Sequence, residues 1–198
     1  MKKNVIVGKN SFVDPSNVFE GNVVIGEDNY IGPNNIIKNT VIGNHNHIEF
    51  SYIEDSTIGN DNSIGPFSHI RNNSIIHNNT RIGNYVEIKN SELFDKVKCA
   101  HLTYLGDCKV DKETNIGCGV ITANYNGKTK ERTLIGKNCF IGCNSVLIAP
   151  ITIGDNCFIA ANSVVNKSLN NDSFAIERNS LTSNISIIKF LAMSRFEC

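Results

Sequence analysis

An aliphatic or phenylalanine residue recurs at every sixth position over long stretches of this chain. This spacing matches neither the 3.6-residue period of an α-helix nor the two-residue alternation of a simple strand. A six-residue repeat is the sequence signature of a parallel β-helix, in which short strands wind into stacked coils. Three runs carry the repeat: Val7, Val13, Phe19, Ile25, Ile31 and Ile37; Ile64, Ile70, Ile76, Ile82 and Ile88; and Ile135, Ile141, Leu147, Ile153, Ile159 and Val165.

Each repeat is expected to form one short strand that points an aliphatic side chain into a narrow central shaft. The Asn and Gly residues between strands favour turns, because both tolerate a positive φ. Three strands then close one coil of about 18 residues, and the coils stack as in other solenoids. Steps of five residues at Ile42, Ile53 and Ile58 are interpreted as corner adjustments. The pattern predicts an all-β domain over residues 1–166, with no helical pattern of domain size.

Two segments break the period. Residues 122–134, "TANYNGKTKERTL", are polar and contain Gly127, so we expect them to leave the coil as a loop. This loop is either a tolerated surface insertion or a functional loop, since long loops in compact domains usually carry function. The second segment is a C-terminal tail, residues 167–198, in which "ISIIKFLAM" is apolar enough to pack against a neighbouring subunit.

The composition fits a soluble globular protein. The chain has 198 residues, 40% of them hydrophobic and 19% charged, with a formal net charge of zero. This balance predicts no interaction with nucleic acid or a membrane surface, although a local basic pocket stays compatible with it. No apolar run near the start resembles a signal peptide, and none reaches the length of a membrane span, so we expect a cytoplasmic protein.

The chain contains seven cysteines, an odd number without a CxxC pair or a common zinc spacing. We interpret most of them as small apolar core residues in a reducing cytoplasm. They are Cys99, Cys108, Cys118, Cys139, Cys143, Cys157 and Cys198.

Candidate chemistry gathers in the middle of the repeat. Arg71 and Lys89 are one predicted coil apart, so they should stack one above the other, with His101, Tyr104 and Asn115 on the following turns. Two stacked cations repel each other. They are tolerable on a solvated face, and they are useful if they hold a phosphate. The spacing alone leaves both interpretations open.

His101 opens the stretch "HLTYLGD" and is either a packed or surface residue or a catalytic base. A metal site would need further histidines nearby. His45 and His47 would point to opposite faces of one strand, and neither His69 nor His77 is a whole coil away from His101. We therefore predict no metal site.

Several stretches resemble a known enzyme family. They are "GPFSHIR", "HLTYLGD", "NIGCGVITANYNGKTK" and "LIGKNCFIGCNSVLIAPITIGDNCFIAANSVV". They are similar to the acetyltransferase domain of the bacterial bifunctional N-acetylglucosamine-1-phosphate uridyltransferase/glucosamine-1-phosphate acetyltransferases. The resemblance extends from about residue 12 to residue 178.

The resemblance implies a left-handed β-helix that forms homotrimers with active sites between subunits. It implies transfer of the acetyl group of acetyl-CoA to glucosamine 1-phosphate, with His101 as the general base. The residues implied to bind the amino-sugar phosphate are Arg71, Lys89, Tyr104, Asn115 and Lys130. The residues implied to bind acetyl-CoA are Cys118, Asn124, Tyr125, Cys143, Ala161 and Arg178, of which Asn124 and Tyr125 lie at the junction with the amino sugar.

Departures from the family qualify these expectations. Alanine is common in the family where Cys118 stands, and serine where Cys143 stands, so a serine hydroxyl contact would be lost at Cys143. No Gly-rich nucleotide loop precedes the repeat, so a separate uridylyltransferase is expected to use the product. Two alternative functions stay open: acetylation of another amino sugar or sugar nucleotide, and a non-catalytic scaffold.

Overall fold

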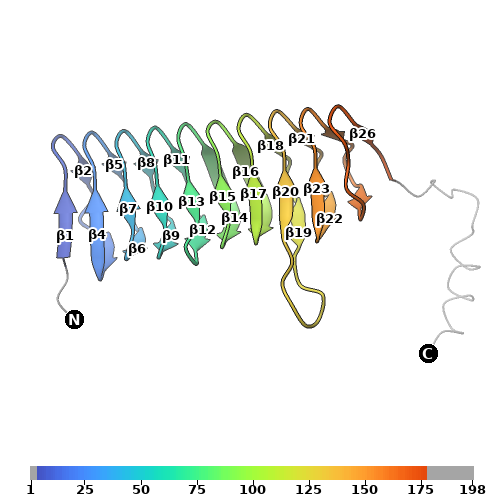
Figure 1. The fold of residues 1–198 in the computed structure, drawn as a ribbon. Coiled ribbons are helices and arrows are strands. Elements are labelled where there is room, and N and C mark those ends of the chain that lie inside the picture. The colour runs from blue at the N-terminus through green and yellow to red at the C-terminus, as the bar shows by residue number, and fades with distance from the viewer. Residues whose placement is uncertain (1–3, 178–198) are drawn as a thin grey trace, which may run out of the picture.

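The computed structural model describes residues 4–177, and all regular secondary structure in this range is β-strand. The strands wind into a solenoid that runs from β1 (Asn4–Val7) at one end to β26 (Phe174–Ala175) at the other (Figure 1). Strands of successive coils pair in parallel. The predicted all-β parallel β-helix is therefore confirmed.

The solenoid has three faces. The first is a sheet of β1, β4 (Asn22–Ile25), β7 (Val41–Ile42), β10 (Thr57–Ile58), β13 (Ile75–Ile76), β15 (Glu92–Leu93), β17 (Cys108–Val110), β20 (Thr133–Ile135) and β23 (Ile151–Ile153). The second holds β2 (Phe12–Val13), β5 (Tyr30–Ile31), β8 (His47–Ile48), β11 (Ser63–Ile64), β18 (Asn115–Ile116), β21 (Phe140–Ile141), β24 (Phe158–Ile159) and β26. The third holds β3 (Val18–Glu20), β6 (Ile36–Lys38), β9 (Tyr52–Glu54), β12 (His69–Arg71), β19 (Ile121–Ala123), β22 (Val146–Ile148) and β25 (Val164–Val165).

Two long strands join the second face to the third. β14 (Arg81–Lys89) and β16 (Lys98–Gly106) each run through the corner between these faces. They bend where Tyr85 and Leu102 adopt positive φ values of 58° and 45°. Because a positive φ is rare for bulky side chains, both positions turn the chain at some cost. The bend places His101 at this corner.

The hand of the coil is visible in Figure 1. The first-face strands in front point upward, and the chain then passes over the top, returns downward behind and advances from left to right. This is a left-handed coil. Ordinary parallel crossovers are right-handed, so the repeat pattern alone did not give this hand.

The length of a coil follows from the strand register. Ile58 pairs with Ile76, a step of 18 residues, whereas Ile25 pairs with Ile42 after 17. The predicted corner adjustments at Ile42, Ile53 and Ile58 are confirmed, because all three side chains are buried in the shaft.

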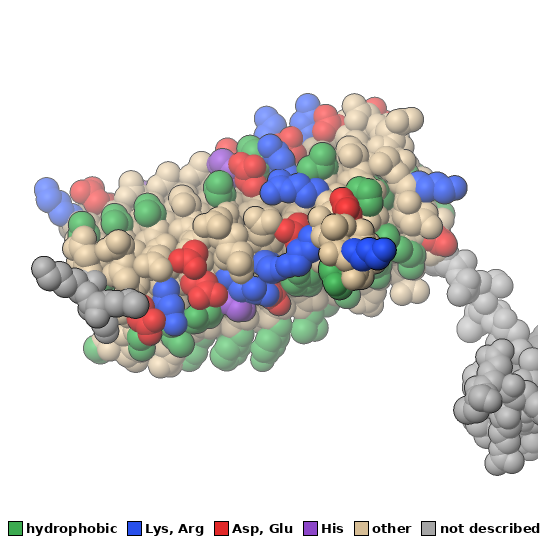
Figure 2. All heavy atoms as spheres, turned by 60° about the horizontal axis from the view of Figure 1, so that its bottom comes forward, with side chains coloured by type: hydrophobic (Ala, Val, Ile, Leu, Met, Phe, Trp, Pro, Cys, Tyr) green, Lys and Arg blue, Asp and Glu red, His purple; other side chains and the backbone are tan. Residues whose placement is uncertain are grey.

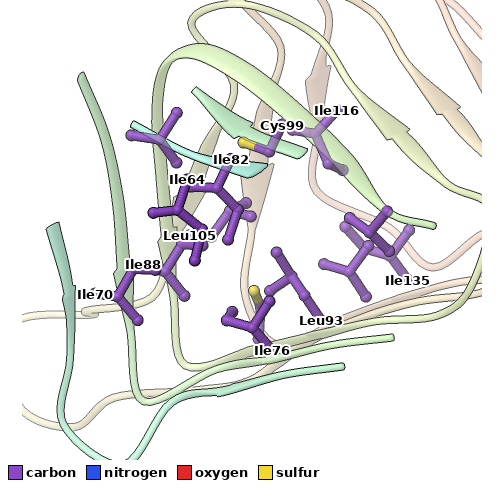
Figure 3. Close-up of a cluster of buried hydrophobic side chains, with 14 of the residues drawn as sticks. Ile64, Ile70, Ile76, Ile82, Ile88, Leu93, Cys99, Leu105, Ile116 and Ile135 are labelled. Carbon is purple, nitrogen blue, oxygen red and sulfur yellow. The ribbon is translucent and has the colours of Figure 1, made fainter. Parts of the chain in front are cut away.

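The core is a continuous stack of buried hydrophobic side chains, most of them aliphatic, contributed by strands of all three faces (Figure 3). Twelve isoleucines are among the largest fully buried side chains, all of them on the predicted six-residue pattern or its adjusted steps. Val7 is a correction to that pattern. It is 44% exposed, because no described coil precedes β1 to cover this end of the shaft.

Buried amide side chains line the corner between the first and second faces. The Oδ1 atom of Asn29 accepts a hydrogen bond from the backbone N–H of Asn46 at 2.8 Å, and Asn46 does the same for Asn62 at 2.9 Å. Asn62 continues the series to Thr80. Each side chain thus supplies a partner for a buried backbone donor of the next coil.

The predicted loop leaves the coil between β19 and β20, at residues 124–132. Thr122 stays in β19, where its hydroxyl accepts a hydrogen bond from the backbone N–H of Gly106 at 2.8 Å. Thr133 begins β20. The coil with this loop is longer than the others, since Val110 pairs with Ile135. Strand pairing continues to β26, so the ladder extends beyond the expected boundary at residue 166.

The cysteines follow the sequence interpretation in part. Cys99, Cys108, Cys139 and Cys157 are buried, Cys118 is half-buried and Cys143 is exposed, while Cys198 lies outside the described residues. Burial raises the pKa of the Cys99 and Cys108 thiols to about 12. These two thiols stay protonated at neutral pH and are poor nucleophiles.

Substitutions of two neighbouring isoleucines of β6 test which side chains form the core of the shaft. Ile37 is fully buried, whereas Ile36 is 39% exposed. We expect Ile37→Ala to lower the free energy of unfolding by about 2–5 kcal/mol, because it removes packed side-chain volume and leaves a cavity. Ile36→Ala is the matched control and should cost far less. Urea unfolding followed by circular dichroism measures both, and equal losses would contradict the assignment of Ile37 to the core.

Candidate functional site

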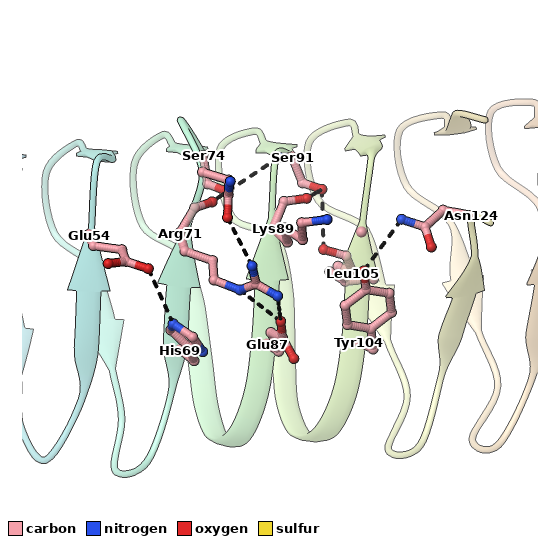
Figure 4. A network of polar contacts seen from close by, with 12 residues as sticks. Glu54, His69, Arg71, Ser74, Glu87, Lys89, Ser91, Tyr104, Leu105 and Asn124 are labelled. Atoms are coloured by element: carbon pink, nitrogen blue, oxygen red, sulfur yellow. Dashed lines mark hydrogen bonds and ion pairs between the residues drawn. The ribbon is translucent and has the colours of Figure 1, made fainter. Parts of the chain in front are cut away.

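The predicted stack of Arg71 and Lys89 is present. Arg71 ends β12 and pairs in register with Lys89, the last residue of β14. Both side chains are half-buried on the third face (Figure 4). The spacing of 18 residues therefore corresponds to one coil at this position.

Glu87 holds the guanidinium group of Arg71. Its Oε1 atom accepts hydrogen bonds from Nε of Arg71 at 2.9 Å and from Nη2 (Figure 4). Nη1 of Arg71 donates to Oδ1 of Asn72 at 2.9 Å. These bonds fix the plane of the guanidinium and leave one N–H on each Nη atom for a ligand. The sequence interpretation missed Glu87, although its spacing from Arg71, two residues short of a coil, was the available signal.

A second lysine lies beside Lys89. Lys130 of the loop is the first cause of a lowered pKa of Lys89; desolvation is the second, and the charge of Asp107 opposes both. Two adjacent cations disfavour each other's charged form. Arg71, Lys89 and Lys130 thus form a cation cluster, the name used below, where an anion would relieve repulsion.

The loop is folded back on itself, which brings Lys130 to this position. Tyr125 and Lys130 form an antiparallel bridge. Asn126 accepts hydrogen bonds from the backbone N–H groups of Lys128 and Thr129 at 2.9 and 2.8 Å. At its tip, Gly127 has a φ of 93°, a conformation that favours glycine. Seen from the side on which the loop projects, charged side chains of both signs gather around its base (Figure 2).

Tyr104 and Asn124 lie next to the cation cluster. Tyr104 pairs with Glu87 across β14 and β16, and its hydroxyl accepts a hydrogen bond from Nδ2 of Asn124 at 3.4 Å (Figure 4). Both side chains cross over Gly106. A Cβ atom at Gly106 would lie 2.3 Å from the Tyr104 hydroxyl and 2.7 Å from the Asn124 amide nitrogen. Glycine is thus required here for the two polar side chains to meet.

His101 lies at the other edge of the third face and is exposed, so it is not a packed core histidine. Its Nδ1 atom lies 3.0 Å from Oδ1 of Asn84, the residue opposite it on β14. An amide oxygen can only accept, so Nδ1 carries the proton and Nε2 keeps its lone pair. A base needs this tautomer, and Asn84, which the sequence interpretation missed, sets it.

Three of the predicted acetyl-CoA residues continue the corner of His101. The register Cys99–Ile116 and Tyr104–Ile121 places Cys118 on the coil after His101. The backbone N–H of Asn144 donates to the carbonyl of Cys118, and that of Asn162 to the carbonyl of Cys143, both at 2.7 Å. Cys143 and Ala161 therefore follow on the next two coils. The four positions form a line, which we call the His101 corner: His101, Cys118, Cys143 and Ala161.

The remaining predicted residues lie elsewhere. Asn115 begins β18 on the second face and pairs with Lys98 and Phe140, so it does not join the cation cluster within one chain. Tyr125 is exposed on the loop, and its hydroxyl donates to the carbonyl of Gly127 at 2.8 Å. Arg178 lies outside the described residues. One chain therefore holds the predicted residues in separate groups along the edges of the third face and on the second face.

Comparison with known families agrees with this repeat. Residues 132–167 match the family model of the bacterial transferase hexapeptide (six repeats), and residues 1–79 match that of the GMPPB C-terminal domain. The bifunctional protein GlmU of Caldicellulosiruptor saccharolyticus is 45% identical over 177 residues, which cover 89% of this chain and 38% of that protein. By sequence, this chain is a relative of GlmU. The resemblance predicted from the motifs is confirmed.

A second GlmU gives the same result. GlmU of Listeria monocytogenes is 41% identical over 188 residues, or 95% of this chain and 41% of that protein. The matching region is the C-terminal part of GlmU. The chain thus spans about two fifths of the length of these curated relatives.

Solved structures share the fold at lower identity. UDP-N-acetylglucosamine acyltransferase of Francisella novicida superposes with a TM-score of 0.63 at 18% identity, covering 82% of this chain and 65% of that one. A mutant perosamine N-acetyltransferase from Caulobacter crescentus, solved with CoA and GDP-perosamine, gives 0.53 at 19% identity, covering 59% and 53%. At this identity, the two structures show that the fold is shared.

Two further properties of residues 4–177 concern metals and membranes. No three His, Cys, Asp or Glu side chains in this range are grouped so that they could hold a metal ion. The same range contains no helix long and apolar enough to cross a bilayer.

Proposed function

We propose that this protein transfers the acetyl group of acetyl-CoA to the amino group of glucosamine 1-phosphate. The observation that carries the proposal is the cation cluster, in which Lys130 of the loop meets the stacked Arg71 and Lys89 beside Tyr104 and Asn124. The similarity to GlmU over 89% of the chain supports the same activity. Arg71, Lys89 and Lys130 would bind the phosphate, and Tyr104 and Asn124 would contact the sugar.

His101 would act as the general base. The amine nitrogen attacks the thioester carbonyl, Nε2 of His101 accepts a proton from the nitrogen, and the CoA thiolate leaves. A neutral imidazole can accept a proton on the ring nitrogen that carries the lone pair. General-base catalysis of this kind contributes about 10²–10⁴-fold. No covalent enzyme intermediate is needed, which agrees with the buried, protonated thiols of Cys99 and Cys108.

The His101 corner would bind acetyl-CoA. Cys118, Cys143 and Ala161 follow His101 on successive coils, so an extended molecule along this corner would reach His101 with one end. The perosamine N-acetyltransferase that shares the fold was solved with CoA. We also propose that the protein is cytoplasmic, because the cysteines of the described residues are free thiols, as is usual in a reducing compartment. Acetyl-CoA is a metabolite of the same compartment.

We also propose a homotrimer. Within one chain, the cation cluster and His101 lie at opposite edges of the third face, and Asn115 lies on the second face. A neighbouring copy would bring His101 and Asn115 of one chain to the cation cluster of another. Light scattering at micromolar concentration should give the mass of a trimer, and a monomer alone would count against a shared site.

The pKa of Lys89 predicts how phosphate binding depends on pH. Because Lys130 lowers this pKa, Lys89 loses its proton, and part of its attraction for phosphate, at a lower pH than an ordinary lysine. Lys130→Ala should raise KM for glucosamine 1-phosphate at neutral pH and shift its alkaline rise to higher pH. Lys128→Ala, also on the exposed loop, is the control and should leave the pH profile unchanged. An unshifted pH profile in Lys130→Ala would mean that Lys130 does not lower the pKa of Lys89.

The proposed activity is tested by thiol release from acetyl-CoA with a panel of amino sugars. We expect glucosamine 1-phosphate to be acetylated and unphosphorylated glucosamine to be a poor acceptor. Preference for another amino sugar or a sugar nucleotide would mean that the protein acetylates that acceptor instead. The perosamine N-acetyltransferase, which shares the fold, was solved with a sugar nucleotide. Absence of thiol release with every acceptor would favour a scaffold.

A further inference from the structure

Asp107 is an unusual residue in this fold. Among residues 4–177 it is the one acidic or basic residue whose side chain is buried, with 6% exposure. It follows Gly106 at the corner between the third and first faces and has a φ of 50°, which aspartate tolerates. A buried carboxylate is costly unless hydrogen bonds compensate for the lost water.

Both carboxylate oxygens of Asp107 have partners from neighbouring coils. Oδ1 accepts a hydrogen bond from Nδ2 of Asn90, and Oδ2 accepts one from Nδ2 of Asn124. Asn124 is itself buried, with 8% exposure, and its backbone carbonyl accepts from the N–H of Glu131 at 2.8 Å. Asp107 thus connects the corner of the coil to the first residue of the loop.

The chemistry of the pair fixes the orientation of the Asn124 amide. A carboxylate can only accept hydrogen bonds, so the amide must turn its NH₂ group toward Asp107. The same nitrogen lies 3.4 Å from the Tyr104 hydroxyl. The carbonyl oxygen of Asn124 is then directed away from Asp107 and is available to a donor. An asparagine at position 107 could accept or donate, and would permit both orientations.

We propose that Asp107 is a positioning residue that fixes the Asn124 amide so that its carbonyl oxygen accepts a hydrogen bond from the amino group of the acceptor sugar. This bond would orient the nitrogen lone pair toward the thioester and stabilise the positive charge that develops on nitrogen during attack. The inference rests on the proposed function. Asp107 itself does not contact the substrate; it orients the amide of Asn124, which does.

The test compares two identical substitutions at one corner. Asp107→Asn preserves volume and removes the orientation. Asp55→Asn is the matched control, because Asp55 lies at the same corner three coils earlier and accepts from Nδ2 of Asn39 at 3.0 Å, but is exposed and far from the loop. We expect Asp107→Asn to lower kcat about tenfold or more, as for the loss of a hydrogen bond to a charged group. Asp55→Asn should keep wild-type kcat.

A third variant separates positioning from folding. Asn90→Ala removes the other hydrogen bond of Asp107 but leaves the one to Asn124. A positioning role predicts that Asn90→Ala keeps at least half of kcat, whereas a structural role predicts that it falls together with Asp107→Asn. A change confined to KM for the sugar phosphate would assign Asp107 to the charge balance of Lys89 and overturn the proposal. Retention of kcat within about twofold in Asp107→Asn would overturn it as well.

A measurement without turnover keeps the inference distinct from the proposed function. Hydrogen exchange of the Asn124 side-chain amide, followed by NMR of the asparagine-labelled protein, should be slow in the wild type and faster in Asp107→Asn. Equal exchange in both would overturn the inference whatever the enzyme acetylates. Slow exchange in the wild type, with no acetylation of glucosamine 1-phosphate, would instead count against the proposed function alone.

Discussion

His101→Ala is expected to lower kcat about 10²-fold or more, with little change in KM for acetyl-CoA. His101 is exposed and makes one side-chain hydrogen bond, to Asn84 at 3.0 Å. Its removal therefore takes away a proton acceptor without opening a cavity, and the thermal midpoint should stay near that of the wild type. Thiol release at saturating acceptor, together with differential scanning calorimetry, measures both quantities.

The control for this variant is His45→Ala, which removes another exposed corner histidine far from the loop. It should leave kcat and the thermal midpoint unchanged. Near wild-type turnover in His101→Ala would mean that another group is the base. Loss of folding in His101→Ala would mean that the histidine has a structural role that its exposure does not reveal.

Arg71→Ala and Lys89→Ala are expected to raise KM for glucosamine 1-phosphate about 10- to 100-fold each, the usual effect of losing a hydrogen bond to a charged group. KM for acetyl-CoA should change far less, because both cations lie at the opposite edge of the third face from the His101 corner. Unphosphorylated glucosamine should be a poor acceptor for all variants and nearly indifferent to the changes. Steady-state kinetics with both sugars measures this contrast.

The matched control for these variants is Arg81→Ala. Arg81 lies on the same long strand, β14, but at its exposed second-face end. Arg71→Lys is a further comparison, because it keeps the charge and loses the paired hydrogen bonds with Glu87. Equal use of glucosamine with and without phosphate by the wild type would contradict phosphate recognition by this cluster.

Much of this protein was predictable from its sequence. The six-residue period located the shaft isoleucines, because each short strand of the repeat turns an aliphatic side chain of the pattern into the shaft. Coil length then predicted that Arg71 lies over Lys89, and the interruption after Ile121 predicted the loop. These features depend on local spacing, which the sequence carries directly.

The site needed more than spacing. Coil lengths of 16, 17 and 18 residues occur, so a fixed spacing does not tell on which face of the next coil a residue lies. His101 and Tyr104 are three residues apart yet lie on either side of a corner, because Leu102 adopts a positive φ between them. Asn115 pairs with Lys98, which precedes that corner, and therefore lies on the second face.

The sequence by itself determined the repeat, the shaft, the stacked cations and the position of the loop, since each follows from the period of one chain. Only the tertiary structure decided which polar groups meet between coils: Glu87 with Arg71, Asn84 with His101, and Asp107 with Asn124. These pairs join residues 16 or 17 positions apart, and their contacts depend on the bend of each corner as well as on coil length. The physical reason is that corner geometry sets the direction of a side chain, while the hydrophobic period sets only its height along the solenoid.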